Sequence, residues 1–168
     1  YIVSPCVMSI EIKVWIQGSC SLYAVVRDEV CLVERFLEQL EEFNVKHAQQ
    51  LASFIDNVSK SDRIMQLMLR PERPDLGVYA MYKQGNGNGP YNPSRLLCAY
   101  VGTGDRILVV GAGFIKTKDG SIQNNAPADR EAKFLADVVN ELNTRIDNGE
   151  IIINGSLLIP HYADSFTL

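Results

Sequence analysis

The feature that most constrains this chain is a run near its middle that is apolar on both faces a strand would present. Residues 106–114 read RILVVGAGF, and after the arginine no polar side chain interrupts the run. A strand with one solvated face alternates between apolar and polar residues, whereas a strand covered on both faces is apolar throughout. The run therefore predicts a central strand of a β-sheet.

Weaker patterns predict further strands around this one. Alternating side chains mark the first of them, where Ile10, Ile12 and Val14 share one face. Near the end of the chain, Asn154-Gly155 lies between two apolar runs, which is typical of a tight hairpin. Proline, glycine and asparagine mark 84–93 as a loop. The predicted strands are 10–16, 22–26, 77–83, 95–101, 151–153 and 157–159.

Between the second and third predicted strands the apolar residues take a helical spacing. This spacing predicts one helix over 30–43 and another over 45–58, separated by Asn44. Two helices joined by so short a break are expected to pack as an antiparallel hairpin. Asp28 is predicted to cap the first helix, because aspartate accepts hydrogen bonds from free amide groups at a helix N-terminus.

A third helix is predicted from about Pro127 to Ile146, with Gly149 after its last turn. Proline favours the first turn of a helix and glycine the position after its end. These elements predict an α+β fold: a small, mainly antiparallel twisted sheet packed against an N-terminal helical hairpin, with a C-terminal helix. We expect residues 1–168 to form a single domain, since the length supports one hydrophobic core.

Composition narrows the class of protein. Apolar residues make up 46% of the chain and charged residues 21%, which is ordinary for a globular protein and unlike a disordered one. No window approaches the apolar run of about 18 residues that a membrane-spanning helix needs. The first residues lack the pattern of a secretory signal. We therefore expect a cytoplasmic protein without a membrane partner.

The charge is negative overall and unevenly spread. The net charge is −4 and the isoelectric point about 5.2, which weighs against nucleic acid because phosphate contacts dominate such binding. Residues 28–44 carry six acidic side chains against Arg35 alone. In contrast, residues 95–118 carry Arg95, Arg106, Lys116 and Lys118 against a single aspartate. An acidic face and a locally basic face are expected.

Several kinds of chemistry are excluded by the residues that are missing. A zinc site is not expected, since no C-x-x-C pair occurs and only two histidines are present. A serine or cysteine hydrolase is not expected either, because no G-x-S-x-G motif or histidine-paired nucleophile is found. We predict no metal and no cofactor. The residues concerned are Cys6, Cys20, Cys31, Cys98, His47 and His161.

The segment Gly111-Ala112-Gly113 begins like a dinucleotide-binding motif but does not complete it. The position for the third glycine holds Lys116, and polar turn residues follow where a helix should begin. The glycines are better explained by a bulge or by close packing of the backbone.

The order of elements and several short motifs together resemble the RelE/HigB/ParE toxin superfamily, in particular its phage-derived HigB-like branch. The motifs are GVYAMYK, RLLCAYVGTGDRILVVGAGFIKTKDG and APADREAKFLADVV. The resemblance covers about residues 22–141. It implies a toxin-like core over 22–146, with an N-terminal strand extension and a C-terminal hairpin-like tail.

The resemblance also implies a function. Active members of the family bind the ribosome, cleave messenger RNA without a metal, and are restrained by a cognate antitoxin. Arg95 matches the family's strand arginine and would clamp a phosphate. The other matching catalytic candidates are Lys83, Tyr82, Lys116 and Lys118, and the RNA-binding candidates are Arg106 and Arg130.

Departures from the family leave an alternative open. The chain is acidic, carries a long GNGNGP insertion, and extends beyond the core at both ends. The alternative is a non-catalytic protein-binding module on the same scaffold, either similar to ParE, which acts on gyrase, or a degenerate toxin. Convergence of Arg95, Lys116, Lys118 and Lys83 on one open concave face would favour the nuclease. A homodimer paired through terminal strands is a further hypothesis.

Overall fold

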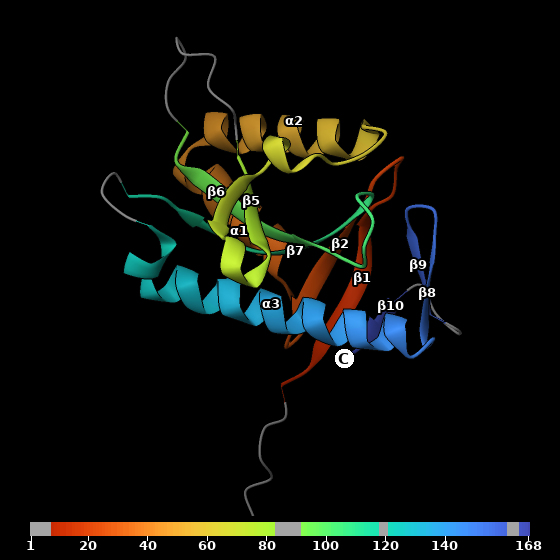
Figure 1. Ribbon diagram of the computed structural model, residues 1–168. Coiled ribbons are helices and arrows are strands. Elements are labelled where there is room, and N and C mark those ends of the chain that lie inside the picture. The colour runs from red at the N-terminus through yellow and green to blue at the C-terminus, as the bar shows by residue number, and fades with distance from the viewer. Residues whose placement is uncertain (1–7, 83–91, 118–120, 161–164) are drawn as a thin grey trace, which may run out of the picture.

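The computed structural model describes residues 8–82, 92–117, 121–160 and 165–168. In these residues a mixed, mainly antiparallel sheet lies between helices, with α2 on one side and α3 on the other (Figure 1). The strands run in the order β10-β1-β2-β7-β6-β5-β4, with β3 added to β2, and among the described strands only β2 and β7 pair in parallel. The strands are β1 (Ile10–Ile16), β2 (Ser21–Arg27), β3 (Val30–Cys31), β4 (Arg70–Arg73), β5 (Val78–Met81), β6 (Ser94–Tyr100), β7 (Ile107–Ile115) and β10 (Ser165–Thr167).

The α+β class is confirmed. The helices are α1 (Leu32–Phe43), α2 (Val45–Lys60) and α3 (Ala126–Asp147), with three short 3-10 turns, η1 (Gln66–Met68), η2 (Pro74–Leu76) and η3 (Ile122–Asn124). The two remaining strands, β8 (Ile151–Asn154) and β9 (Leu157–Pro160), form a separate hairpin.

The prediction of a central strand is confirmed by β7, which has three strands on each side in the sheet order. Its side chains alternate between two hydrophobic cores. Ile107 and Val109 belong to the core beneath α3, and Leu108 and Val110 belong to the core beneath α1 and α2. Because helices cover both faces, neither face of the strand needs polar side chains.

The glycines of β7 admit neighbouring side chains, as the sequence predicted. A Cβ on Gly113 would lie 2.2 Å from the ring of Phe36 on α1, so only glycine leaves room for that ring. The pairing of β6 with β7 also shifts register between Leu96 and Cys98. This close packing accounts for glycines that otherwise imitate a nucleotide-binding motif.

The predicted helices are confirmed, with local chemistry that explains their ends. Asn44 separates α1 from α2 and caps α2, since its side chain accepts a hydrogen bond from the His47 amide at 3.1 Å. Asn125 caps α3 in the same way, Pro127 lies in its first turn, and the Gly149 that follows the helix has a φ of 75°.

The prediction for Asp28 is wrong. Asp28 and Glu29 have φ values of 50° and 68° and form the tight turn between β2 and β3, while the N-cap position of α1 is Cys31. The Asp28 carboxylate instead accepts a hydrogen bond from the backbone amide of Ser9 at 3.0 Å. A charged residue before an apolar run with helical spacing is compatible with a turn as well as with a helix cap. The pairing of β3 with β2 makes these residues a turn.

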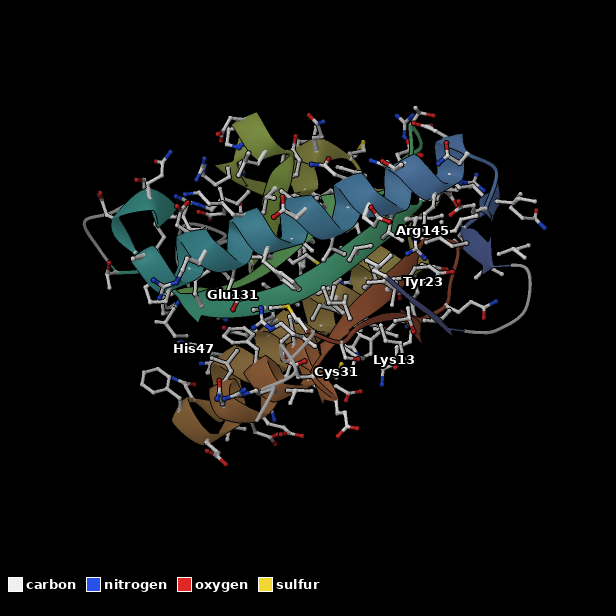
Figure 2. All side chains as sticks on the ribbon, turned by 90° about the horizontal axis from the view of Figure 1, so that it is seen from below. Lys13, Tyr23, Cys31, His47, Glu131 and Arg145 are labelled. Carbon is white, nitrogen blue, oxygen red and sulfur yellow. The ribbon has the colours of Figure 1, made fainter. Side chains whose placement is uncertain are left out.

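The C-terminal hairpin is confirmed, but its turn lies one residue later than predicted. Asn154 pairs with Leu157, so Gly155 and Ser156 form the turn. The hairpin is anchored to the sheet by Tyr23, whose hydroxyl donates to the Leu158 carbonyl oxygen and accepts from the Leu158 amide at 2.8 Å. Figure 2 shows Tyr23 beside the C-terminal half of α3.

Besides β3, which occupies the first two residues of the helix predicted over 30–43, two further strands of the described residues lie where no strand was predicted. β4 occupies a proline-marked segment expected to be a connector, and its Pro71 is tolerated because β4 is an edge strand. β10 pairs with β1 at the opposite edge. The edges of the sheet are therefore β4 and β10, which places β1 inside it.

Candidate functional site

Three residues selected from the sequence meet at one end of the sheet. Tyr82 follows β5, Arg95 lies near the start of β6, and Lys116 follows β7. Because these neighbouring strands are antiparallel, the end of one lies beside the start of the next. Accordingly, the Lys116 amide donates to the Pro93 carbonyl oxygen at 2.8 Å.

Two further charged residues join them from β4. Arg70 pairs in register with Ala80, which places the start of β4 beside the end of β5. The Arg70 Nε lies 3.2 Å and the Arg95 Nε 3.9 Å from the Glu72 carboxylate, whose side chain is only 4% exposed. We call Arg70, Glu72, Tyr82, Arg95 and Lys116 the Glu72 cluster.

Arg95 is a buried member of the Glu72 cluster. The residue is 1% exposed, and its Nη1 donates to the carbonyl oxygens of Asn92 at 2.9 Å and Ser94 at 2.8 Å. Its guanidinium carbon also lies 5.1 Å from the centre of the Tyr82 ring, within cation–π range. Arg95 thus contributes its charge from inside the protein, and its guanidinium is not at the surface.

Counted over the described residues, the Glu72 cluster holds more positive than negative charge, with Arg70, Arg95 and Lys116 around one carboxylate. Burial raises the pKa of Glu72, and the nearby Arg70, Lys116 and Arg95 only partly offset this effect. Burial, followed by repulsion from Arg70 and Arg95, lowers the pKa of Lys116. The two shifts bring the pKa values of a carboxyl group and an amine closer together, which is the pattern expected of groups that exchange a proton.

The other predicted residues lie elsewhere. Arg106 and Lys116 stand at opposite ends of β7, about 30 Å apart at about 3.3 Å per residue. Arg130 is exposed on α3, next to Asp129, which pairs with Arg73 rather than with the Glu72 cluster. Lys83 and Lys118, together with His161 and most of the predicted loop 84–93, lie outside the described residues.

Arg70 and Glu72 were missed by sequence reasoning. They lie in a segment read as a connector, because two prolines interrupt it and its charged side chains show no apolar alternation. Strand alternation could not have found them, because the pairing of β4 with β5 shifts register between Pro71 and Arg73, and Glu72 lies at that irregularity.

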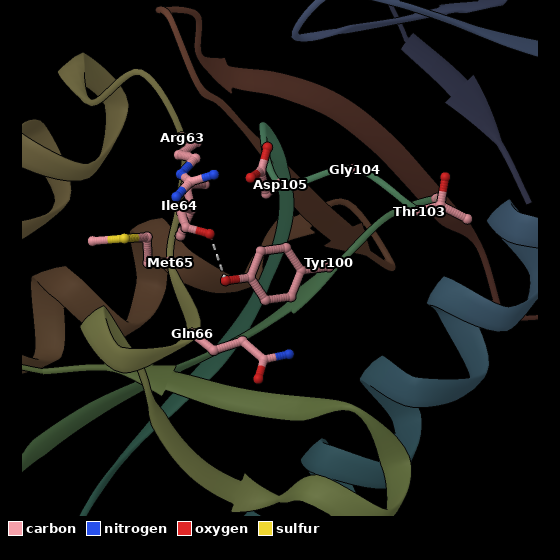
Figure 3. Close-up of a pocket in the computed structure, with 9 residues that line it drawn as sticks. Arg63, Ile64, Met65, Gln66, Tyr100, Thr103, Gly104 and Asp105 are labelled. Carbon is pink, nitrogen blue, oxygen red and sulfur yellow. Dashed lines mark hydrogen bonds between the residues drawn. The ribbon is translucent and has the colours of Figure 1, made fainter.

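A pocket of about 400 Å³ lies at the opposite end of β6 (Figure 3). Its lining includes Arg63, Gln66, Thr103 and Asp105 around the ring of Tyr100. The Tyr100 hydroxyl donates to the Ile64 carbonyl oxygen at 2.8 Å, and burial raises its pKa. Tyr100 therefore shapes the pocket and does not carry protons near neutral pH.

Cysteine and histidine side chains form no reactive site in the part of the chain that the structure describes. Cys20, Cys31 and Cys98 are free thiols there, and burial raises the pKa of each, which disfavours a thiolate. Cys31 and His47 are both labelled in Figure 2. No group of three potential ligands that could hold a metal ion occurs among the described residues.

Comparisons with known proteins do not extend this picture. No protein-family model, no curated protein and no solved structure matches the chain. The resemblance to the RelE/HigB/ParE superfamily therefore rests on element order and short motifs. In addition, none of the helices in the described ranges combines the length and the apolar character needed to cross a membrane.

Proposed function

We propose that this protein is a toxin of the RelE/HigB type, which cleaves messenger RNA without a metal and uses the Glu72 cluster as its site. The observation that supports the proposal is the meeting of Tyr82, Arg95 and Lys116, selected from three separate strands, near the carboxylate of Glu72. The local excess of positive charge offers a phosphate site on a chain whose net charge is −4.

The chemistry follows from the charges. Attack by a ribose 2′-oxygen on the adjacent phosphorus forms a cyclic phosphate and breaks the bond to the 5′-oxygen. Arg70 and Lys116 would stabilise the negative charge that builds on the phosphoryl oxygens. Glu72, whose pKa is raised, would accept the 2′-hydroxyl proton, and Lys116, whose pKa is lowered, would protonate the leaving oxygen. Arg95 would position Glu72 and Tyr82 from within.

The test is induced expression in bacteria, following growth and transcript integrity together. The wild type is compared with Lys116→Gln and with the control Lys133→Gln, which removes one lysine charge from the exposed side of α3. We expect the wild type and the control to arrest growth with cleaved transcripts, whereas Lys116→Gln restores both growth and intact transcripts. The Arg95→Ala/Lys116→Ala/Lys118→Ala variant should behave like Lys116→Gln.

A second candidate is the protein-binding module, and the burial of Arg95 favours it. An arginine that is 1% exposed and bonded to two backbone carbonyls has a structural use that requires no RNA. Growth arrest with intact transcripts would point to this candidate and to a target such as gyrase. Normal growth at high soluble expression would contradict an active toxin of either kind.

A further inference from the structure

Residues of α1 and α2 line an open apolar groove. The groove has a volume of about 250 Å³ and runs between α1 and α2. On α2 its lining residues recur at intervals of three and four, which places them in one stripe along the helix. Val45 is 52% exposed and contributes apolar surface to the groove. The groove is lined by Leu37, Glu41, Val45, Ala48, Gln49 and Ala52.

An acidic stripe borders this groove on α1. Glu34, Glu38 and Glu41 are spaced by four and three residues, so they lie on one face of the helix and flank Leu37. All three side chains are exposed. Arg35, the one basic residue of α1, lies about 160° from Leu37 on the Glu38 side of the helix, at about 100° per residue. The groove is therefore apolar at its floor and negative along one rim.

We infer that this groove binds a basic amphipathic helix of a partner protein. Its apolar floor suits leucine-sized side chains that recur every three or four residues, the arrangement by which a helix docks in a groove. The rim of Glu34, Glu38 and Glu41 suits lysine or arginine on the flank of that helix. An acidic rim repels RNA, so this surface serves a protein and is independent of the Glu72 cluster.

The groove geometry also limits the ligand. α1 has 12 residues and α2 has 16, so the groove extends at most about 18–24 Å at about 1.5 Å per residue. The small side chains of Ala48 and Ala52 allow the backbone of a docked helix to approach closely. A partner helix of about four turns would cover this surface.

The experiment uses fluorescently labelled model peptides of about 14 residues, with leucines at helical spacing and lysines on the flanks. Two control peptides have the same leucines with glutamate flanks, and the same composition in scrambled order. Binding to the full chain is followed by anisotropy at about 50 mM and about 300 mM salt. The wild type is compared with Glu34→Gln/Glu38→Gln/Glu41→Gln, and a matched variant, Asp137→Asn/Glu141→Gln/Glu150→Gln, removes as many exposed carboxylates from α3 and the residues that follow it.

We expect the lysine-flanked peptide to bind with a Kd of about 10 μM at low salt, weakening as salt rises. The groove variant should lose about tenfold in affinity and the matched variant less than about twofold. Equal losses in both variants, or equal binding of the glutamate-flanked or scrambled peptide, would overturn the inference. So would the absence of binding, or self-association of the chain that the peptide displaces, because the occupant would then be a second copy.

Discussion

Two groups of charged side chains on the sheet differ in their ratio of cations to carboxylates. Arg27 on β2 donates two hydrogen bonds, at 3.0 and 2.8 Å, to both oxygens of Glu131 on α3, and Glu131 is labelled on that helix in Figure 2. Arg73 at the end of β4 likewise pairs with Asp129 on α3 and with Asp75. In these bridges each guanidinium has at least one carboxylate of its own.

The Glu72 cluster differs because, within the part of the chain that the structure describes, three cations lie around one carboxylate. A balanced bridge is complete within the protein and serves to hold α3 against the sheet. An unbalanced cluster places like charges close together, which is costly unless an anion joins them. The difference between the two groups therefore separates bridges that hold α3 against the sheet from a cluster in which, among the described residues, cations outnumber carboxylates.

The largest effect that would sharpen this comparison is expected from Arg95→Met, with Arg27→Met as its matched control. Arg95 is buried and holds two carbonyl groups besides facing Glu72, so its loss should lower the free energy of unfolding by about 3 kcal/mol. Arg27 is 25% exposed, and its loss should cost about 1 kcal/mol. Urea titration of both variants measures the two losses. Equal losses would mean that Arg95 is no more embedded than an ordinary surface bridge.

Only some of the elements behind this comparison could be predicted from the sequence. β7 was predictable because its apolar run has no polar face, and the helix ends were predictable because Asn44 and Pro127 act through local chemistry. β4 was not, because an edge strand with a proline has neither apolar alternation nor a turn signal. Its pairing with β5 depends on contacts between residues distant in the sequence. Because β4 was not predicted, Glu72 was not selected as a site residue.

The site residues were only partly predicted from the sequence for the same reason. Tyr82, Arg95 and Lys116 lie on or beside strands whose sequence patterns are strong, so a resemblance could select them. Arg106 was selected with them since it belongs to the same basic stretch, yet the length of β7 separates it from Lys116. The residues of one sequence motif are neighbours along the chain, whereas an antiparallel sheet brings together the ends of different strands.

A smaller effect is expected from an inorganic anion. If phosphate binds the Glu72 cluster with a Kd of about 2 mM, about 20 mM phosphate should stabilise the folded chain by about 1.4 kcal/mol. For a chain of this size the Tm should then rise by about 3–6 °C. Thermal denaturation in phosphate and in chloride of equal ionic strength measures the shift.

Variants decide where that phosphate binds. The rise in Tm should disappear in Arg70→Gln and Lys116→Gln, because each removes a cation from the unbalanced cluster. It should persist in Arg27→Gln, because that bridge is already neutral. A rise that survives in all three variants would place the phosphate elsewhere and remove the distinction between the two groups of charges.

The smallest expected effect is a difference in the sign of pH dependence between Glu72 and Asp129. Burial raises the pKa of Glu72, so its proton is held more tightly in the folded chain. Its contribution to stability is therefore present at low pH and lost as pH rises from about 4.5 through the raised pKa. Asp129 is the opposite case, since burial, which would raise its pKa, is outweighed by hydrogen bonds from Arg73 and Lys133 that lower it.

The Asp129 contribution is therefore present above about pH 3.8 and lost as pH falls through the lowered pKa. Urea titrations at a series of pH values would compare the wild type with Glu72→Gln and with Asp129→Asn. Relative to Glu72→Gln, the wild type should lose stability as pH rises, by at most about 1.4 kcal/mol per pH unit. Relative to Asp129→Asn it should gain stability. If both differences rise with pH, the cations around Glu72 outweigh its burial, and the Glu72 cluster is a structural bridge like the others.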